Sequence, residues 1–484
     1  MKMRWIWTMA LVMSAWVAIP SCGPDQSSPE PCWPGYTLCG QACVSLATSL
    51  DHCGACDVVC WAGQDCVDGA CVDAGGPGNG GASAGDAWPT AGATCTPDTT
   101  PDHDEDANID LGTSHQRIAG FGGISVPGWI DDLTTQQVDQ AFGNGPGQLG
   151  LSILRVRIPF DSGEFGREVP TAVRAISHGA IVLATPWTPP PQMKTNNNVV
   201  GGRLSPNSYG AYADHLLDFR DFMKSNGVPL YAISVQNEPD IDVDYESCYW
   251  SASEFVAWLN GHASRFGDTR LVVAESFNFS RSVTDAILND ASAEQHVDII
   301  GGHIYGGGLS DYPLARQKGK EVWMTEHYTD SASPANAWPL ALDVGKELHD
   351  CMSANFNAYI WWYIRRSYGL LTEDGNVSKR GYLMSQYSKF IRPGFVRVEA
   401  SQPDVRNVYV TAYRGDGQLV VVAVNMATAE QTITLDIKRG CVDRLARYTT
   451  SRTKNVSDDG TVTLVDHEVE VTLEAQSVTT FVSE

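Results

Sequence analysis

Eight short apolar segments recur between residues 118 and 363, and each is separated from the next by a stretch with helical periodicity. In one such stretch, bulky apolar side chains recur every three or four positions from Tyr209 to Phe222, and Asn226 and Gly227 end the pattern. Eight strand–helix units predict an α/β fold of the (β/α)8 TIM-barrel type. A doubly wound sheet is the next choice, but the Gly120–Gly123 segment lacks the spacing of a dinucleotide-binding loop. The expected strands are Ile118–Gly122, Ser152–Arg157, Ile181–Ala184, Leu230–Val235, Leu271–Ala274, Ile299–His303, Val322–Thr325 and Ala358–Tyr363.

From about Pro393 onward the chain shows strand patterns alone, with apolar residues at every second position and polar turns between the strands. This pattern predicts a C-terminal antiparallel β-sandwich that packs on the barrel as a side domain. A short strand near Asn108–Leu111 is expected to join it, so the side domain would comprise residues 108–117 and 391–484, and the barrel residues 118–390. The expected strands are Asn407–Tyr413, Leu419–Asn425, Thr432–Ile437, Thr461–Val465, Glu468–Leu473 and Val478–Val482.

Residues 1–22 predict export from the cell. Lys2 and Arg4 precede an apolar run from Trp5 to Ile19 that is too short for a spanning helix and is typical of a signal peptide. The segment around Cys22 resembles a bacterial lipobox, and lipidation of Cys22 would leave an even number of the 13 cysteines. The alternative is an ordinary cleaved signal peptide. We therefore expect an exported bacterial protein that is secreted or held on the cell surface or outer membrane as a lipoprotein.

Residues 23–72 hold eight cysteines in a stretch too short to build an adequate core. In an exported chain this composition predicts a disulfide-stapled module, whereas the Cys53–Cys56 spacing alone would also fit zinc. Residues 73–107 are rich in Gly, Ala, Pro and Asp, which predicts a flexible linker. The sequence leaves open the partner of the module and the pairing of the remaining cysteines, which are Cys95, Cys248, Cys351 and Cys441.

Acidic residues outnumber basic ones, 57 against 33, which gives a formal net charge of −24. This balance argues against nucleic acid as a partner, because few cations are available to displace counterions from phosphates. The 43% of hydrophobic residues suffice for a substantial core, and we expect a monomer. The ends of the fourth and seventh expected strands offer no His/Asp constellation for a metal and no Gly-x-Ser-x-Gly elbow, so neither a metal nor a cofactor is expected.

Two glutamates stand where barrel enzymes carry their chemistry, at the carboxyl ends of strands. Glu238 follows the fourth expected strand within an Asn-Glu-Pro triplet, and Glu326 ends the seventh. Either one alone would more often form a salt bridge on the barrel rim, but two carboxylates facing one mouth match what glycosidic bond cleavage requires. Glu275 after the fifth strand and Asp161 after the second are competing acids, which we interpret as structural or rim groups.

Aromatic side chains gather near the same strand ends. As a set they suit stacking on sugar rings, although any one of them alone would more often belong to the core. Two arginines, Arg365 and Arg366, follow the eighth expected strand, and their simplest interpretation is pairing with nearby acids. The aromatic residues are Trp129, Trp187, Trp250, Tyr305, Tyr328, Trp361, Trp362 and Tyr368.

From about Gly120 to the C-terminus the chain closely resembles glycoside hydrolase family 30, and within it the subfamily 8 glucuronoxylanases. The resemblance leaves the cysteine-rich segment and the linker outside. It implies the barrel with its β-sandwich, and a retaining endo-β-1,4-xylanase that cuts glucuronoxylan near (4-O-methyl)glucuronic acid branches. The matching segments are Tyr231–Asp240, Trp323–Glu326, Trp361–Gly369, Lys379–Tyr382 and Ser388–Gly394.

The same resemblance implies roles for individual residues. Glu238 would be the acid/base and Glu326 the nucleophile, with Asn237 bonding the sugar 2-hydroxyl and Tyr305 orienting Glu326. Because two nearby carboxylates do not both ionise cheaply, Glu238 is expected to hold its proton in the free protein. A pocket for the acid sugar is implied at Tyr328, Ser331, Trp362, Arg366 and Tyr368, and Trp129, Trp187 and Trp250 are further candidates for sugar contacts.

Two other functions are compatible with the sequence. One is a hydrolase of the same fold that acts on another β-glucan or β-glucoside, which the Trp362, Arg366 and Tyr368 set disfavours. The other is a non-catalytic carbohydrate-binding surface lipoprotein, which the presence of both Glu238 and Glu326 disfavours.

Overall fold

The computed structural model of the chain describes residues 37–39, 42–44, 46, 54–56, 64–67, 70–73 and 107–484. The chain divides into two units, residues 1–80 and 81–484. The described strands of the first unit form two antiparallel hairpins, β1 (Thr37–Cys39) with β2 (Ala42–Val44) and β3 (Gln64–Val67) with β4 (Ala70–Asp73). The predicted signal peptide with Cys22, most of the cysteine-rich module and nearly all of the linker lie outside the described residues. Within the described ranges, no helix combines the length and apolar character needed to cross a membrane.

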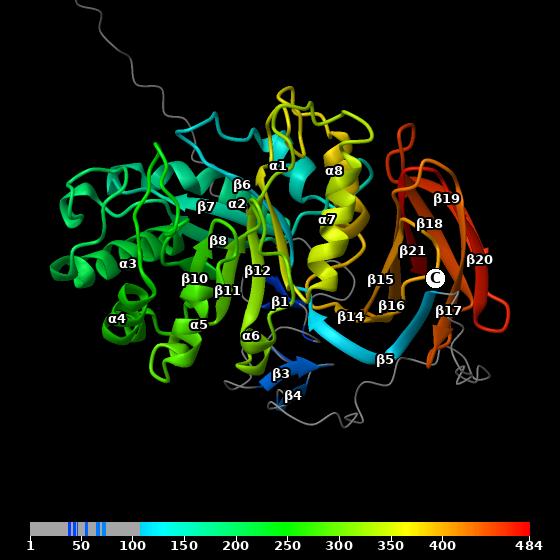
Figure 1. The fold of residues 1–484 in the computed structure, drawn as a ribbon, viewed down its shortest axis with the longest axis horizontal. Helices are drawn as coiled ribbons and strands as arrows, with labels where there is room; N and C mark the ends of the chain where they lie inside the picture. The colour runs from blue at the N-terminus through cyan, green and yellow to red at the C-terminus, as the bar shows by residue number, and fades with distance from the viewer. Residues whose placement is uncertain are drawn as a thin grey trace, which may run out of the picture. The chain divides into compact units, whose positions relative to one another are not determined.

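Eight parallel strands close into a barrel in the order β6 to β13, which confirms the predicted fold class (Figure 1). Its interior is packed with side chains, including Ile153, Leu183, Val272 and Trp323, so the barrel is a core and not a channel. The strands are β6 (Gly120–Ser125), β7 (Ile153–Ile158), β8 (Ile181–Pro186), β9 (Ala232–Ser234), β10 (Arg270–Ser276), β11 (Ile299–His303), β12 (Glu321–His327) and β13 (Ala358–Tyr363).

Local sequence signals begin and end several of the helices between these strands. Capping boxes start α1, through Thr134 and Gln137, and α4, through Ser251 and Glu254. Helix α3 ends at Ser225, and Gly227 adopts a φ of 81°, as the Asn-Gly pair predicts. The helices are α1 (Thr135–Phe142), α2 (Val169–Ser177), α3 (Tyr209–Ser225), α4 (Ala252–His262), α5 (Arg281–Asn289), α6 (Pro313–Gln317), α7 (Leu342–Ser353) and α8 (Lys379–Ser388).

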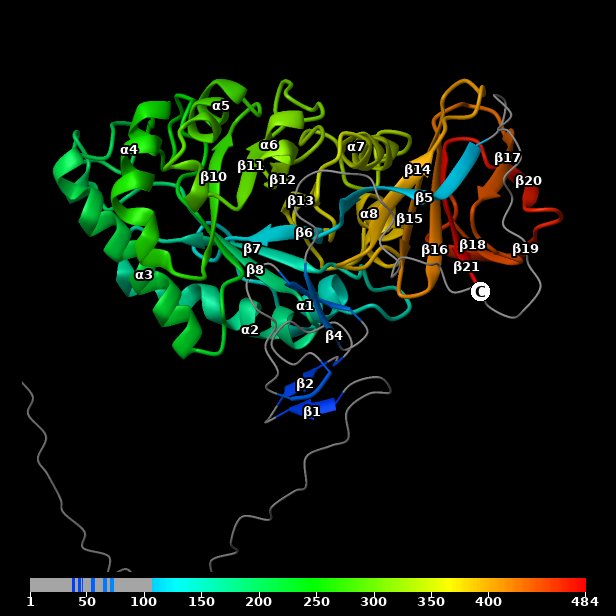
Figure 2. The same ribbon diagram turned by 90° about the horizontal axis from the view of Figure 1, so that it is seen from below.

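The side domain is a nine-stranded sheet that curls around its own apolar core. Neighbouring strands are antiparallel except β5 and β17, which are parallel. Strand β5 lies between β14 and β17, so a segment that precedes the barrel belongs to the C-terminal sheet (Figure 2). The strands are β5 (Ala107–Arg117), β14 (Val396–Ala400), β15 (Val408–Gly415), β16 (Gln418–Asn425), β17 (Gln431–Lys438), β18 (Arg444–Thr450), β19 (Ser457–Thr463), β20 (Glu468–Leu473) and β21 (Ser477–Ser483).

Two strands of this sheet were not expected, and one lies earlier than expected. Strand β14 alternates apolar and charged residues but is only five residues long, and β18 carries two arginines and shows no clear apolar alternation. Strand β19 begins at Ser457 and not at Thr461, because an edge strand exposed to water has few apolar residues to mark it.

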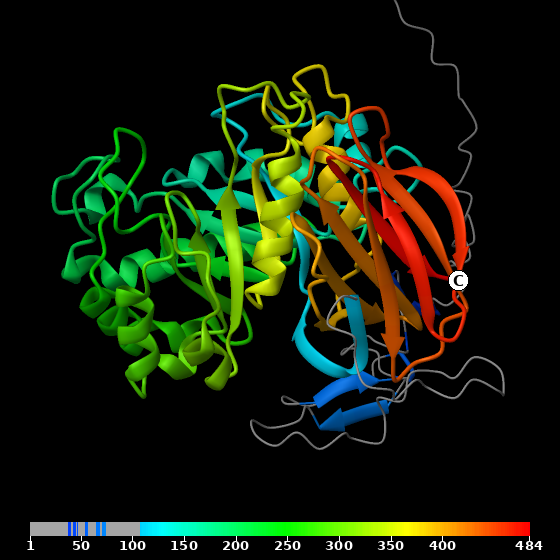
Figure 3. The same cartoon turned by 45° about the vertical axis from the view of Figure 1, so that its right-hand side comes forward.

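Helices α7 and α8 lie between the barrel and the side domain (Figures 1 and 3). Helix α7 packs on β15, β16 and β21, and α8 packs on β18 and β21. Lys379, at the start of α8, donates to the backbone carbonyls of Ser451 and Lys454 in the side domain. The side domain therefore supports the helices that follow the seventh and eighth barrel strands, whose loops reach the site described below.

Two cysteines of the barrel are free thiols. Cys248 and Cys351 are buried, and burial raises the pKa of both, to about 12 for Cys248. An even number of cysteines, as expected after lipidation of Cys22, is therefore compatible with free thiols in the barrel.

Candidate active site

Glu238 and Glu326 lie at the carboxyl end of the barrel, as the sequence predicts. Glu326 belongs to β12, and Glu238 follows shortly after β9 with a φ of 43°. The backbone N–H of Glu238 donates to the carbonyl of Glu275 at 3.0 Å, and that of Asn237 donates to the carbonyl of Pro186 at 2.9 Å. These bonds to the ends of β10 and β8 hold a backbone conformation that is unfavourable for a residue other than glycine.

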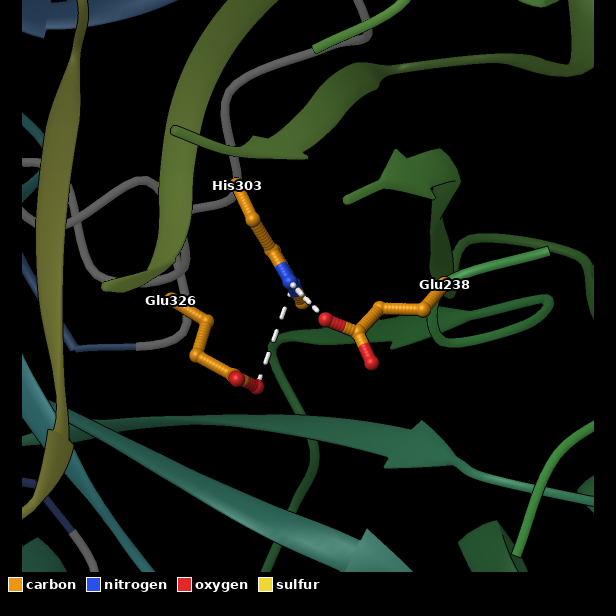
Figure 4. A group of neighbouring side chains, drawn as sticks. All are labelled: Glu238, His303 and Glu326. Atoms are coloured by element: carbon orange, nitrogen blue, oxygen red, sulfur yellow. Dashed lines mark hydrogen bonds and ion pairs between the residues drawn. The ribbon is translucent and has the colours of Figure 1, made fainter. Parts of the chain in front are cut away.

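The two carboxylates are neighbours. An oxygen of Glu238, an oxygen of Glu326 and a ring nitrogen of His303 all lie within 4.8 Å of one another, and Figure 4 shows the imidazole between the two acids. Glu238 is 4% exposed and Glu326 is 6% exposed. Two negative charges this close together and shielded from water must be stabilised by cations and hydrogen-bond donors, and the surrounding side chains supply them.

Glu326 is held by Arg155 and Tyr305. The Arg155 guanidinium donates to Glu326 Oε2 at 2.5 Å and to Asn237 Oδ1 at 2.7 Å, and it forms an ion pair with Glu275 at 3.1 Å. Tyr305 donates to Glu326 Oε1 at 3.1 Å, which matches its predicted place beside the nucleophile candidate. Glu275 is fully buried against Arg155, so this competing acid is structural. The second competing acid, Asp161, caps a 3-10 helix (Ser162–Glu168), accepts from the Gly163 N–H and is also structural.

Glu238 is held by His303 and Tyr245. His303 Nδ1 lies 3.1 Å from Glu238 Oε1, and the Tyr245 hydroxyl donates to Glu238 Oε2 at 2.6 Å. His303 Nε2 lies 3.9 Å from Glu326 Oε2, so one imidazole spans both acids. Imidazole and two carboxylates are also zinc ligands, but Glu326 is already paired with the Arg155 cation. We therefore interpret the cluster as one that transfers protons.

The charges of these groups correct one expectation. Burial raises the pKa of Glu238, but the hydrogen bond and charge of His303 and the Tyr245 hydroxyl outweigh it and hold that pKa below its usual value. Burial raises the pKa of Glu326 above its usual value. Burial lowers the pKa of His303, but the two carboxylates together outweigh it and raise that pKa above its usual value. In the free protein the proton expected on Glu238 is therefore favoured on His303 instead.

A cavity of about 380 Å³ opens over the carboxylate pair. Trp129 and Trp187 pack edge to face with ring centroids 5.3 Å apart, and Trp362 lies 5.9 Å from Trp187, so three indoles form one wall. A larger groove beside α3, of about 550 Å³, contains neither catalytic candidate. The cavity is lined by Trp129, Trp187, Glu238, Tyr245, Phe277, Tyr305, Glu326, Tyr328 and Trp362.

Three of the expected aromatic residues do not line this cavity: Tyr368, which packs on Tyr328, and the buried Trp250 and Trp361. Trp250 is 3% exposed and packs among Tyr209, Phe255 and Trp258, so its expected contact with sugar is wrong. Trp361 is fully buried in the main core. Trp250 and Trp361 point into the core, so apolar packing, and not the motif in which each residue stands, determines their orientation.

Of the residues predicted to bind an acid sugar, Trp362 belongs to β13 and the others lie on the loops after β12 and β13. The Tyr328 and Tyr368 rings are 5.0 Å apart, and burial raises the pKa of Tyr368 although Arg366 and Trp362 lie close enough to lower it. The Arg366 guanidinium is 40% exposed and lies 3.6 Å from Glu373. Ser331 is exposed on the β12 loop.

Buried Arg380 and a close backbone contact fix these two loops. Arg380 donates to the carbonyls of Tyr368 and Asp330, and so ties the β13 loop to the β12 loop. A Cβ on Gly369 would lie 2.5 Å from the backbone nitrogen of Arg366, so only glycine allows this tight turn.

Several functional candidates were missed by sequence reasoning. Arg155 and Arg157 interrupt the otherwise apolar strand β7, and a charge inside a buried strand is a usable signal of a buried partner. His303 ends β11, where strand-end reasoning could have found it. Tyr245 and Phe277 lie on loops with no distinctive pattern, and only the fold brings them to the cavity.

Phenylalanine in place of Tyr245 is expected to raise the pKa of Glu238, because it removes a donor that stabilises the ionised carboxylate. The limb of the kcat/KM–pH profile that Glu238 sets should move to higher pH, with kcat reduced by less than about 10-fold. Tyr249→Phe, on the same loop but bonded to Asp242, is the matched control and should leave the profile unchanged. An unmoved limb in the Tyr245 variant would show that this hydroxyl does not govern Glu238.

Two domain families match the chain. Residues 164–346 match the glycosyl hydrolase family 30 TIM-barrel domain, and residues 394–481 match the glycosyl hydrolase family 30 beta sandwich domain. The chain is 44% identical over 388 residues to the glucuronoxylanase XynC of Bacillus subtilis, a match that covers 78% of this chain and 91% of that one.

Solved structures agree with these matches. The subfamily 8 family 30 xylanase Xyn30A of Clostridium acetobutylicum superposes with a TM-score of 0.74 at 39% identity, covering 78% of this chain and all of that one. A family 30 endoxylanase of Clostridium papyrosolvens superposes with a TM-score of 0.72 at 36% identity, with 78% and 100% coverage. With both domains matched and a close relative covered almost end to end, the chain belongs to glycosyl hydrolase family 30 and is a glycoside hydrolase.

Proposed function

We propose that this protein is a retaining endo-β-1,4-xylanase that hydrolyses glucuronoxylan at positions set by (4-O-methyl)glucuronic acid branches. The observation that carries the proposal is the carboxylate pair, with oxygens of Glu238 and Glu326 within 4.8 Å of each other. Retaining glycosidases hold their two carboxyl groups about 5–5.5 Å apart, whereas inverting ones leave about 6.5–9.5 Å for a water. The relatives named glucuronoxylanase and xylanase support xylan as the substrate.

In the first half of the reaction, a Glu326 oxygen attacks the anomeric carbon and Glu238 gives a proton to the leaving glycosidic oxygen. Arg155 supports the ionised form of Glu326. A proton on His303 can move along the 3.1 Å contact to Glu238 Oε1, which turns the imidazolium into imidazole and the carboxylate into the acid.

In the second half, the sugar is esterified to Glu326 and that residue no longer carries a negative charge. Because the negative charge of Glu326 no longer raises the pKa of Glu238, that pKa falls and Glu238 can act as a base. It takes a proton from water, the oxygen of that water attacks the anomeric carbon, and the bond to Glu326 breaks. Glu326 leaves as a carboxylate and Glu238 ends protonated, and return of that proton to His303 along the 3.1 Å contact restores the starting state.

Specificity for the branch is assigned to Arg366 in this proposal. Its guanidinium is half-exposed at the end of a tyrosine pair and its nearest acid is the exposed Glu373, which an incoming uronate can replace. A planar guanidinium binds a carboxylate through two parallel hydrogen bonds, each worth about 1.5–3 kcal/mol. Fixing the branch fixes the register of the main chain over the carboxylate pair.

Alanine in place of Arg366 is expected to lower kcat/KM on glucuronoxylan by about 10- to 100-fold, because the paired bonds to the uronate are lost. Hydrolysis of unbranched xylan should change little. Arg366→Lys keeps the charge without the fork and should recover only part of the loss. Equal losses on the branched and unbranched polymers would contradict the assignment.

Product analysis tests the function as a whole. Digestion of glucuronoxylan should yield products that each carry one uronate at a constant distance from the reducing end. A panel of neutral β-glucans, assayed in parallel, separates this function from a hydrolase of the same fold with another substrate. Products with randomly placed uronates would contradict branch-directed cleavage.

We also propose that the chain is exported, carries a lipid on Cys22 and acts as a monomer. The signal-like first 22 residues and the lipobox-like sequence around Cys22 support export and lipidation. Palmitate labelling of the full chain in a bacterial host, compared with Cys22→Ser, tests the anchor, and sedimentation of the soluble chain tests the oligomeric state.

A further inference from the structure

Strand β7 carries two buried arginines, and each lies over a tryptophan of the cavity. Arg155 is 0% and Arg157 is 3% exposed. The Arg155 guanidinium is 4.8 Å from the Trp187 ring centroid, and that of Arg157 is 5.3 Å from the Trp129 ring centroid. Arg155 contacts the catalytic carboxylate Glu326 directly, whereas within residues 107–484 Arg157 pairs with Glu164 and Glu246 and with neither catalytic carboxylate. Arg157 is therefore a buried charge that the mechanism above does not use.

Arg157 joins the aromatic wall to two acids. Its guanidinium forms ion pairs with Glu164 at 3.2 Å and with Glu246 at 3.5 Å. The Trp129 indole in turn lies close enough to Glu246 to lower the pKa of that carboxyl, against the larger effect of burial, which raises it. Trp129 therefore has Arg157 at its face and Glu246 nearby, and Arg157 contacts both groups.

Glu246 also connects Arg157 to the acid/base candidate. It is adjacent in sequence to Tyr245, whose hydroxyl donates to Glu238 at 2.6 Å. The next residue, Ser247, is anchored by Lys194, which donates to its backbone carbonyl at 2.6 Å. The segment that places the Tyr245 hydroxyl is therefore held on one side by Arg157 through Glu246 and on the other by Lys194.

We propose that Arg157 is a positioning residue of the active site, which holds the Trp129 wall and the Tyr245 hydroxyl in their places through Glu246. The proposal rests on the proposed function. A planar guanidinium can stack on an indole and pair with two carboxylates at once, whereas an ammonium group cannot do both in the same geometry. Loss of Arg157 should consequently affect sugar binding through Trp129 and proton transfer through Tyr245, although Arg157 itself touches neither reacting group.

The principal test is Arg157→Met, which keeps the length of the side chain and removes its charge. The KM for glucuronoxylan should rise by about 10-fold while kcat falls by less than about 3-fold, because the main loss is in substrate binding. The kcat/KM–pH limb set by Glu238 should move to higher pH, in the same direction as in Tyr245→Phe. The groups that face Glu238 and contribute to that limb are Tyr245, His303, Asn237, Arg155 and Glu326.

A double-variant cycle separates positioning from general destabilisation. If Arg157 acts on Glu238 through Tyr245, Arg157→Met combined with Tyr245→Phe should shift the limb no further than Tyr245→Phe alone. Glu246→Gln keeps the side-chain shape and should give a smaller rise in KM, which provides a test if Arg157→Met fails to fold. Arg157→Lys should recover only part of the loss. Arg174→Met, which breaks an exposed pair with Asp139, is the matched control and should change none of these values.

A measurement without turnover distinguishes this inference from the proposed function. In protein labelled with 5-fluorotryptophan, the Trp129 resonance is assigned by its loss in Trp129→Phe. Arg157→Met should shift or broaden that resonance more than those of the other tryptophans. An unmoved Trp129 resonance together with unchanged KM and pH profile would overturn the inference, whereas a wild-type protein inactive on every xylan would overturn the proposed function and leave the resonance test standing.

Discussion

Glycine in place of Glu326 is expected to lower kcat on glucuronoxylan by about 10⁴- to 10⁶-fold, because the attacking carboxylate is removed outright. Sodium azide should restore turnover, since the small anion fits the vacated space and attacks the anomeric carbon from the side that Glu326 occupied. The product would be an α-glycosyl azide, with net inversion. The measurement is kcat with and without azide on an aryl β-xyloside with a good leaving group, with the product configuration read by NMR.

Glu238→Gly is the matched control for this prediction. With an activated leaving group, no general acid is needed to form the glycosyl-enzyme, and azide then reacts with that intermediate in place of water. The product should be a β-glycosyl azide, with net retention. An α-azide from the Glu238 variant, or undiminished activity in the Glu326 variant, would show that the roles are assigned to the wrong carboxylates.

Methionine in place of Arg155 is expected to lower the free energy of unfolding by about 3–5 kcal/mol, because it leaves buried carboxylates without their cation. Arg155 pairs with both Glu275 and Glu326 and is fully buried. Urea unfolding of the variant and the wild type gives the difference. Arg174→Met, which removes an exposed ion pair, should cause little change. A wild-type unfolding midpoint in the Arg155 variant would contradict a structural role for this charge.

Arg155→Met should also shift the pH dependence of kcat/KM. The Arg155 charge lowers the pKa of Glu326 against the effect of burial, so its loss raises that pKa further. The nucleophile must be ionised, and the limb of the kcat/KM profile that reports its ionisation should therefore move to higher pH. At the original optimum, kcat/KM should fall by more than about 100-fold, since Asn237 also loses its bond to Arg155.

The positions of the barrel strands along the sequence could be predicted because each strand is marked by its own residues. Each barrel strand is buried on both faces, so it must be apolar nearly throughout, and the helical stretches between strands carry a different period. Strand β18 escaped prediction because its sequence carries two arginines in seven residues, and its pairing with β21 and β19 depends on residues far away. The one parallel pair of the side-domain sheet, β5 with β17, likewise joins segments more than 300 residues apart and has no local signal.

The candidate site was predictable to the extent that strand ends meet at one face of a barrel. Glu238, Glu326 and Tyr305 follow from that rule. The rule does not give the direction of a side chain, which is why Trp250 and Trp361 were wrongly grouped with Trp129 and Trp187. Nor does it give the ionisation of the pair, because the pKa of Glu238 depends on His303 and Tyr245, and neither contact can be read from spacing.

By itself, the sequence determined that the chain folds as a barrel with a β-sandwich and that two acids face one mouth, since apolar periodicity and strand ends are local properties. The tertiary structure alone decided which charges neutralise those acids, which aromatic rings line the cavity and which loop brings Tyr245 to Glu238. Those outcomes depend on distances of a few ångströms between residues remote in sequence, and only the packed fold sets them.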